Sequence, residues 1–155
     1  MKIGHFYFIS DKYFEDFKDS GLMKNRDAGD RPCFYAILDS IHNIYWMIPI
    51  SSKIDKYRNI YSKNVSKYGV CDTIVFGKFL GKEKAFLIQN ICPVVDKYIE
   101  NEYVYEKNIP ITIDKKLEKI ISRKANLVLK LVRRGRKLVF PDILKIENKL
   151  IETLS

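Results

Sequence analysis

The sequence predicts an α+β fold in which a compact, antiparallel, barrel-like β-sheet is elaborated by helices, with a long basic helix and a C-terminal helix. Three observations indicate this class. The first two thirds of the chain contain short runs rich in aromatic and β-branched residues, which are typical of strands. The last third instead repeats its apolar residues at helical spacing. The length suits one domain, so we expect residues 1–155 to form a single unit.

A strand and a short helix are expected at the start of the chain. Residues 3–9 are apolar at most positions, which predicts a central strand rather than one with a wet face. Ser10 has the position of an N-cap for a helix over residues 11–18, in which Tyr13 belongs to the apolar face. Residues 19–30 are polar and contain two glycines, so we expect a loop there.

Four further strands are expected in the middle of the chain, over residues 33–41, 44–50, 73–80 and 85–89. Asn43 tolerates the left-handed backbone region, which favours a tight hairpin turn at residues 42–43. A second turn is expected at residues 81–82. Residues 51–69 lose the alternation of strands. Pro93 is expected to open a short helix that continues through residue 98.

The last third predicts two helices. The longer one covers residues 113–134, and its apolar face comprises Ile113, Leu117, Ile120, Ile121, Leu127, Val128 and Leu131. Gly135 has the position of the residue that follows a helix in the left-handed conformation. Pro141 opens the last helix, whose inward side includes Ile143 and Leu150.

Positive charge is concentrated in two segments. The chain has 28 Lys and Arg against 19 Asp and Glu, a formal net charge of +9. Residues 114–137 contain ten basic and two acidic residues, and residues 53–84 contain eight basic and three acidic residues. The remainder of the chain is net negative. Because the charge is localised, it indicates a polyanionic partner, for which nucleic acid is the leading candidate.

The composition argues against a metal centre, a cofactor and a membrane span. Cys33, Cys71 and Cys92 lie in or beside apolar stretches, so we expect three buried free thiols. They form no C-x-x-C pair, and His5 and His42 are the two histidines, so no zinc site is expected. No apolar run approaches the ~20 residues that a membrane helix needs. The N-terminal segment turns polar before a signal-peptide core could form, which predicts a cytoplasmic protein.

A possible reactive group lies at the end of the third predicted strand, where Ser51, Ser52 and Lys53 follow a hydrophobic run. Cleavage of a phosphodiester by its own 2′-hydroxyl needs proton transfer at two oxygens and positive charge beside the phosphorane. Two hydroxyls and an ammonium could supply these functions. The alternative is structural: one serine caps the next helix, and Lys53 lies in solvent.

Three stretches of the first half carry a family resemblance. Residues 6–13 are FYFISDKY, residues 31–38 are RPCFYAIL and residues 46–53 are WMIPISSK. Together they resemble the toxins of type III toxin–antitoxin systems, the ToxN/AbiQ family, and are most similar to its CptN branch. The length, the basic charge and the lysine-rich helical second half also match that family.

The resemblance implies a metal-independent endoribonuclease that cleaves RNA by 2′-hydroxyl attack and leaves a 2′,3′-cyclic phosphate. It implies two RNA partners, the substrate RNA and an RNA antitoxin made of repeats that fold into pseudoknots. The antitoxin would bind along a basic groove and form a closed protein–RNA hetero-oligomer. The fold implied is the compact barrel of the Kid and MazF toxins, elaborated by helices.

The resemblance assigns four catalytic positions in this chain: Ser51, Ser52, Lys53 and Tyr13. Two departures from the family pattern affect them. Other branches have a proline between the serine and the lysine, which is absent here, so Lys53 can be offset by one position. They also have a lysine at the start of the second strand, where this chain has Cys33. Arg31, two residues earlier, is the candidate replacement.

The basic segments predict where RNA would bind. Cations on the long helix should project from the side opposite its apolar face, and tyrosines between lysines suit base stacking. The expected RNA-binding residues are Lys12, Arg31, Lys56, Tyr57, Arg58, Lys115, Lys119, Lys130, Arg133 and Arg134.

Two other functions are open at this stage. A non-catalytic RNA-binding protein could use the same basic groove without cleaving its ligand. A DNA-binding regulator is a weaker alternative, because the last two helices show no obvious helix that would read the major groove. His5 and His42 are the default acid–base pair of a nuclease, but their positions in a strand and a turn favour structural roles.

Overall fold

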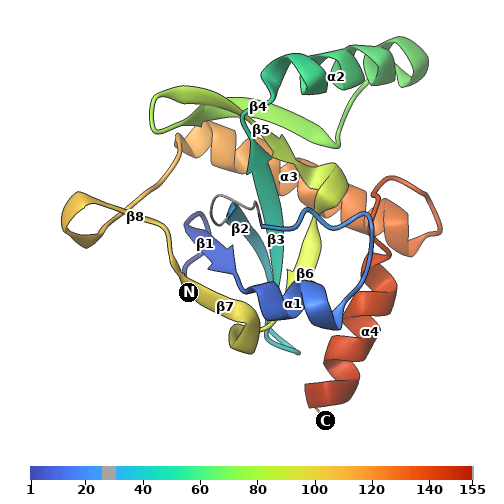
Figure 1. Cartoon of the computed structure of the whole chain (residues 1–155). Coiled ribbons are helices and arrows are strands. Elements are labelled where there is room, and N and C mark those ends of the chain that lie inside the picture. The colour runs from blue at the N-terminus through green and yellow to red at the C-terminus, as the bar shows by residue number, and fades with distance from the viewer. Residues whose placement is uncertain (26–30, 155) are drawn as a thin grey trace.

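The computed structural model describes residues 1–25 and 31–154, and within them one antiparallel sheet is surrounded by helices (Figure 1). The sheet comprises β1 (Phe6–Ile9), β2 (Pro32–Asp39), β3 (Ile44–Ser51), β4 (Ile74–Phe79), β5 (Lys82–Leu87), β6 (Cys92–Val94) and β7 (Ile99–Glu102). The α-helices are α1 (Asp11–Asp16), α2 (Ile54–Tyr68), α3 (Lys115–Arg133) and α4 (Ile143–Leu154). A separate small hairpin contains β8 (Val104–Tyr105) and β9 (Ile109–Pro110).

The sheet is open. Its strand order is β4-β5-β3-β2-β1-β7, and β6 pairs with β3 beside β5. The α+β class and the antiparallel pairing are confirmed. The expected barrel-like closure is not found in the described part of the chain, because β4 and β7 form the two ends of the sheet without pairing to each other.

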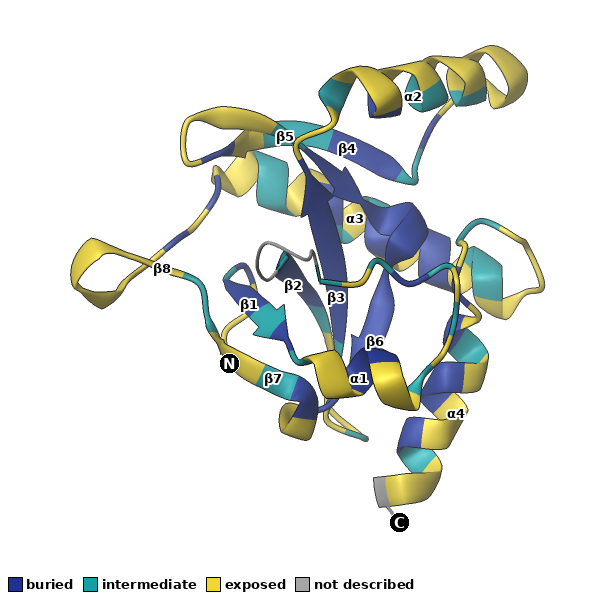
Figure 2. Ribbon diagram, in the orientation of Figure 1, coloured by how far each residue is buried: buried dark blue, intermediate teal, exposed yellow. Residues whose placement is uncertain are grey.

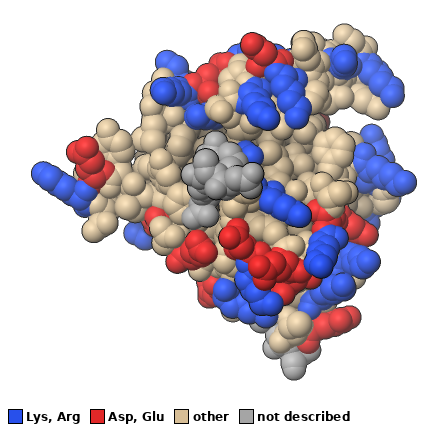
Figure 3. Space-filling model, viewed as in Figure 1, with Lys and Arg blue, Asp and Glu red and all other residues tan. Residues whose placement is uncertain are grey.

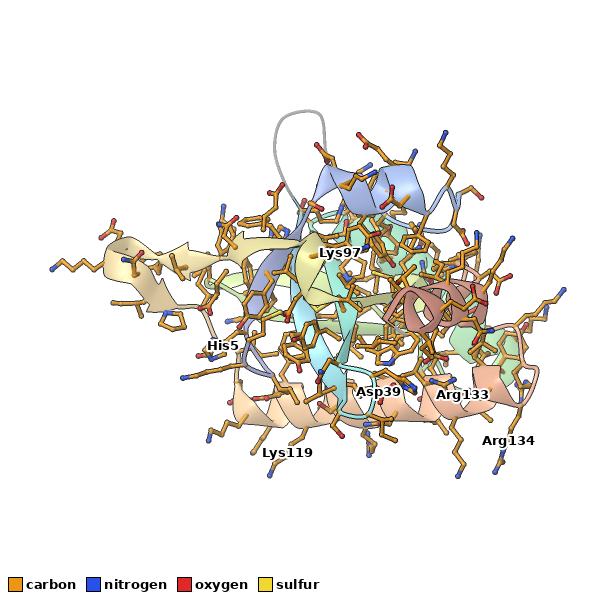
Figure 4. The ribbon with its side chains drawn as sticks, turned by 90° about the horizontal axis from the view of Figure 1, so that it is seen from below. His5, Asp39, Lys97, Lys119, Arg133 and Arg134 are labelled. Atoms are coloured by element: carbon orange, nitrogen blue, oxygen red, sulfur yellow. The ribbon has the colours of Figure 1, made fainter. Side chains whose placement is uncertain are left out.

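Helices cover both faces of the sheet. In Figure 1, α3 lies behind the strands and α1 lies in front of them, and the view from below in Figure 4 shows the same two sides. The apolar residues between these layers form one continuous core that extends from Phe6 in β1 to Leu150 in α4. Its centre is aromatic, with the rings of Phe6, Phe34 and Phe86 in mutual contact. A second, smaller core lies between α2 and the β4–β5 hairpin.

The third strand is buried along almost its whole length (Figure 2). Both of its edges are paired, to β2 on one side and to β6 and β5 on the other. Because consecutive residues of β3 are buried, neither face of the strand is open to solvent, and its sequence shows no alternation of apolar and polar residues. This explains the continuous apolar run that predicted it.

Several local predictions from the sequence are confirmed. Asn43 adopts a positive φ of 54° in the β2–β3 turn, and Gly135 has φ 94° directly after α3. Ser10 has the N-cap position of α1, although its hydroxyl makes no capping hydrogen bond. The three cysteines are buried free thiols. Among the described helices, none is long and apolar enough to cross a membrane.

Other predictions were wrong. Pro93 lies in β6 opposite Trp46 instead of opening a helix, because the neighbouring residues pair with β3 and the helical turn begins only at Asp96. Ile120 and Leu127 were expected on the buried face of α3 but are exposed. Ala125 and Leu129 are buried on that helix instead. The predicted loop over residues 19–30 is only partly described, since residues 26–30 lie outside the described residues.

Candidate functional site

The Ser-Ser-Lys step lies at the point where β3 leaves the sheet. Ser51 is the last residue of β3 and is buried opposite Ala85 of β5. Ser52 and Lys53 are both exposed, and α2 begins immediately afterwards at Ile54. The end of a rigid, fully paired strand therefore presents one hydroxyl and one ammonium group to solvent at a fixed position.

The two serines have different environments. The hydroxyl oxygen of Ser51 accepts a hydrogen bond from the Lys53 backbone N–H at 3.2 Å, which shapes the turn into α2. Ser51 therefore supports this turn, but the N-cap residue of α2 is Lys53 and no side chain caps the helix, so the alternative that a serine caps α2 was wrong. Within the described residues, the hydroxyl of Ser52 makes no hydrogen bond, so it is available to a ligand.

Arg31 lies beside this step. Its Nη1 donates to the carbonyl oxygen of Ile50, the residue before Ser51, at 2.9 Å. The positive charge also acts on the Tyr57 hydroxyl: burial raises the pKa of Tyr57, and Arg31 opposes that increase. Although Arg31 and Ser52 are far apart in sequence, the β2–β3 pairing brings them to the same end of the sheet. Arg31 therefore lies near the Ser-Ser-Lys step, and its role as a replacement for the family's lysine stays a prediction.

Tyr13 is not at this site. Its side chain is 0% exposed, and its hydroxyl donates to the carbonyl oxygen of Pro93 at 2.7 Å. The ring packs against Phe17 and Tyr98. Burial raises the pKa of Tyr13 well above its ordinary value, so the hydroxyl stays protonated. The prediction that Tyr13 is catalytic was wrong, because the helix turns this residue towards the core.

The residues at the start of α2 divide into one buried and two exposed side chains. Tyr57 is buried in the smaller core and cannot stack on a base, so its predicted role in RNA binding was wrong. Lys56 is exposed, with its ammonium 5.4 Å from the centre of the Tyr57 ring. Arg58 is exposed but engaged, since it pairs with Glu83 and lies over the ring of Phe76.

The long helix α3 presents cations on the side away from the sheet. Lys119 and Arg134 point outwards from the body of the protein in Figure 4. Lys115 and Lys130 are also exposed, and among the described residues none of these four side chains forms an ion pair. The side chains of Ile121 and Val128 pack into the core from the opposite side of the helix.

Arg133 has a different role from these four residues. Its guanidinium donates to both carboxylate oxygens of Glu147 in α4, at 2.8 and 2.7 Å, and lies 5.9 Å from the Trp46 ring. The hydrogen bonds that Arg133 donates to Glu147 raise the pKa of Arg133. This pair joins α3 to the buried carboxylate of α4, so Arg133 is engaged within the protein although its side chain is 47% exposed. Its contact with RNA stays a prediction.

Lys12 also differs from the expectation. Its ammonium forms an ion pair with Asp16 at 2.7 Å, and that hydrogen bond raises the pKa of Lys12 and lowers the pKa of Asp16. Asp11 and Glu15 lie on the same short helix. Acidic side chains gather over this part of the face in Figure 3. This surface would repel a phosphate backbone, so it does not support an RNA contact at Lys12.

Both histidines are remote from Ser52. The Nδ1 atom of His5 lies 3.4 Å from Glu102 near the β1–β7 edge, and His42 Nδ1 lies 2.9 Å from Asp39 in the β2–β3 turn. His42 lies in the turn that the sequence predicted, whereas His5 lies directly before β1 instead of within the strand. In the parts of the chain that the structure describes, no three His, Cys, Asp or Glu side chains gather in a group that could hold a metal ion.

One polar residue of interest was missed by the sequence-based reasoning. Gln89 was assigned to a strand, but it lies in a turn of 3-10 helix (Ile88–Asn90) with its side chain almost fully buried. It forms part of a groove beside α2 together with Phe140. The available signal was the occurrence of two amides, Gln89 and Asn90, inside the apolar run of residues 85–95.

The contrast between Arg133 and Arg134 gives a direct test of the α3–α4 ion pair. Arg133→Met keeps an apolar side chain beside Trp46 but leaves the buried carboxylate of Glu147 without its partner, so the free energy of unfolding should fall by ~1–3 kcal/mol. Arg134→Met is the matched control and should change stability by less than ~0.5 kcal/mol. Urea denaturation measures both values, and equal losses would contradict the structural role of Arg133.

Comparisons with known proteins give a fold. No protein-family model matches the chain, and no curated protein matches it in sequence. Among solved structures, the chain is similar to AbiQ, which is described as a lactococcal anti-phage endoribonuclease belonging to the type-III toxin–antitoxin system. The two share 16% identity with a TM-score of 0.64, and the match covers 96% of each chain. The chain therefore shares the fold of AbiQ over 96% of its length.

Proposed function

We propose that this chain is the toxin of a type III toxin–antitoxin system, a metal-independent endoribonuclease that an RNA antitoxin of pseudoknot repeats inhibits by direct binding. The observation that carries the proposal is the exposed Ser52–Lys53 step beside Arg31 at the end of β3, on the AbiQ fold. AbiQ is itself an endoribonuclease of such a system, which supports the same reaction class here.

In the proposed reaction, the 2′-hydroxyl oxygen of the substrate attacks the adjacent phosphorus and the bond to the 5′-oxygen breaks, which leaves a 2′,3′-cyclic phosphate. The Ser52 hydroxyl passes the 2′-proton to water. Lys53 gives a proton to the leaving 5′-oxygen and regains one from solvent. The guanidinium of Arg31 and the ammonium of Lys53 stabilise the charge of the phosphorane, and Ser51 holds the turn that positions them.

The antitoxin would bind a larger basic surface than the substrate does. The unpaired cations of α3, together with Lys56 at the start of α2, provide positive charge at several separate points. Such a distribution suits a folded RNA that contacts the protein through many phosphates. A closed assembly of toxin and antitoxin, in the cytoplasm, completes the proposal.

Cleavage should not depend on a divalent ion, because in this proposal Arg31 and Lys53 supply the positive charge at the phosphorane. Purified protein incubated with a long RNA and excess EDTA should yield fragments with 2′,3′-cyclic phosphate and 5′-hydroxyl ends. Mass spectrometry of the fragment ends measures this. Fragments with 3′-hydroxyl and 5′-phosphate ends, or activity that returns only with Mg²⁺, would contradict the mechanism.

Ser52→Ala should lower the cleavage rate by ~10²–10³-fold, because it removes a group that acts mainly in the transition state. Antitoxin affinity, which is distributed over many phosphates, should barely change. Tyr13→Phe is the control: it should remain active, since Tyr13 is buried. Single-turnover cleavage and growth arrest without antitoxin report the effect. If wild type bound RNA without cleaving it, the non-catalytic binding function would replace this one.

The outward side of α3 should contribute to antitoxin binding. Changing Lys119, Lys130 and Arg134 to Glu should weaken binding and reduce the slope of log affinity against log salt by ~0.7 for each phosphate that the protein no longer neutralises. Circular dichroism should show a folded protein, because none of the three side chains is buried. The matched control changes Lys145 and Lys149 of α4 to Glu. Equal effects in both variants would mean that α3 has no special role.

A further inference from the structure

A groove runs along one side of α2, between that helix and residues 136–140. Its larger part has a volume of about 810 Å³, and a smaller part of about 430 Å³ continues it towards the start of α2. Both parts are lined by Ile60, Gln89 and Phe140, so they form one continuous surface, which we call the Gln89 groove. Lys56 lines one end, only four residues after Ser52.

The side chain of Gln89 has no hydrogen-bond partner in this groove among the described residues, although the residue is only 6% exposed. Its neighbour Asn90 is similarly buried, but that amide donates to the Gly21 carbonyl oxygen at 2.8 Å. The amide of Gln89 is not among the buried side-chain atoms that lack a partner in the described residues, so its polar atoms reach the surface of the groove. An amide that is open to the groove and makes no hydrogen bond within the protein is free to bind a ligand there.

Gln89 is held rigidly. Its backbone N–H donates to Thr73 and its carbonyl oxygen accepts from the N–H of Phe140, each at 2.9 Å. The Phe140 segment is itself fixed, since the Asp142 N–H donates to Asp19 at 2.8 Å. A Cβ atom on Gly21 would clash with the Phe140 backbone, so this glycine is required for the close approach. The amide and the aromatic ring are therefore positioned before any ligand binds.

Two aromatic side chains on the groove are unusually exposed. Phe140 is 68% exposed and Tyr68 is 63% exposed, and both line the larger part of the groove together with aliphatic and polar side chains. Flat aromatic surfaces beside a hydrogen-bonding amide are the two features with which proteins bind an unpaired nucleobase: stacking on its face and recognition of its edge.

The charge around the groove favours an anionic ligand. Lys56 lies at one end, Arg136 and Lys137 lie at the other, and within the described residues none of them pairs with a carboxylate. The acidic side chain in the lining, Asp72, lies 3.9 Å from the ammonium of Lys124. The groove thus combines cations at its ends with aromatic rings and a free amide between them.

We propose that the Gln89 groove binds single-stranded RNA, with one base stacked on Phe140 and its edge hydrogen-bonded to the Gln89 amide, and with phosphates contacting Lys56, Arg136 and Lys137. This inference rests on the proposed function in taking RNA as the substrate. The groove follows α2 from Lys56 to Tyr68, a length of about 18 Å at 1.5 Å per residue. It leads away from Ser52, so the base that it holds would select which phosphate is cut.

The test uses full-length Ser52→Ala protein, so that no RNA is cleaved, and labelled homopolymers of A, U, C and G about eight nucleotides long. Fluorescence anisotropy measures the four affinities. The starting protein should prefer one base. Adding Gln89→Met, which keeps the size of the side chain, should remove that preference. Adding Phe140→Ala should weaken all four complexes by ~5- to 100-fold.

Tyr105→Ala is the matched control, because Tyr105 is an exposed aromatic on the separate β8–β9 hairpin and should have no effect. Thermal unfolding shows whether each variant is folded, and Gln89→Glu provides a second variant of similar size that should repel the RNA. Unchanged affinities in the Gln89 and Phe140 variants, or failure of every RNA to bind, would overturn the proposal. The proposal would also be overturned if an unrelated peptide displaced the labelled RNA as well as unlabelled RNA does.

The two proposals can fail separately. Suppose that protein with Ser52 intact cleaves RNA, but that Gln89→Met changes neither the cut sites nor the base preference. The groove then does not bind a base, and the proposed nuclease function is unaffected. If the homopolymers bind with a preference that depends on Gln89, but no RNA is ever cleaved, the base-binding proposal is supported and the proposed nuclease function is wrong.

Discussion

The backbone of β3 is hydrogen-bonded on both edges, to β2 along one side and to β6 and β5 along the other, so the strand cannot slide without breaking pairs on both. Its register fixes where the chain emerges at Ser52. The same pairing with β2 brings Arg31 to that end of the sheet. The positions of the candidate catalytic groups are therefore set by backbone hydrogen bonds deep in the protein rather than by contacts at the surface.

The basic residues divide into two groups that net charge does not distinguish. Arg133 and Lys12 pair with carboxylates within the protein, and Arg133 joins two helices through a buried carboxylate. Lys119, Lys130 and Arg134 have no such partner among the described residues. Cations of the second group can neutralise phosphates without first breaking an ion pair within the protein. The proposed RNA-binding surface is therefore smaller than the sequence indicates.

Features set by neighbouring residues could be predicted from the sequence, and features set by distant contacts could not. The turn at Asn43 and the end of α3 at Gly135 follow from local backbone preferences. The helical spacing placed Tyr13 on the apolar face of its helix, but it could not show that the hydroxyl bonds to Pro93 and that the ring packs on Tyr98, which lie far along the chain. The same limitation hid the groove, since Gln89 and Phe140 meet only through a tertiary hydrogen bond.

The contact between Phe140 and Gln89 also affects the order in which the protein becomes functional during synthesis. Chains leave the ribosome from the N-terminus, so Ser52 and α2 are made long before residues 138–142. The wall of the groove that carries Phe140 cannot form until those residues arrive, and α3 and α4 complete the core at the same late stage. If Ser52 and the groove act as proposed, a growing chain has its reactive groups before it has the surface that guides RNA towards them, and this order would protect the translating ribosome and its message from early cleavage.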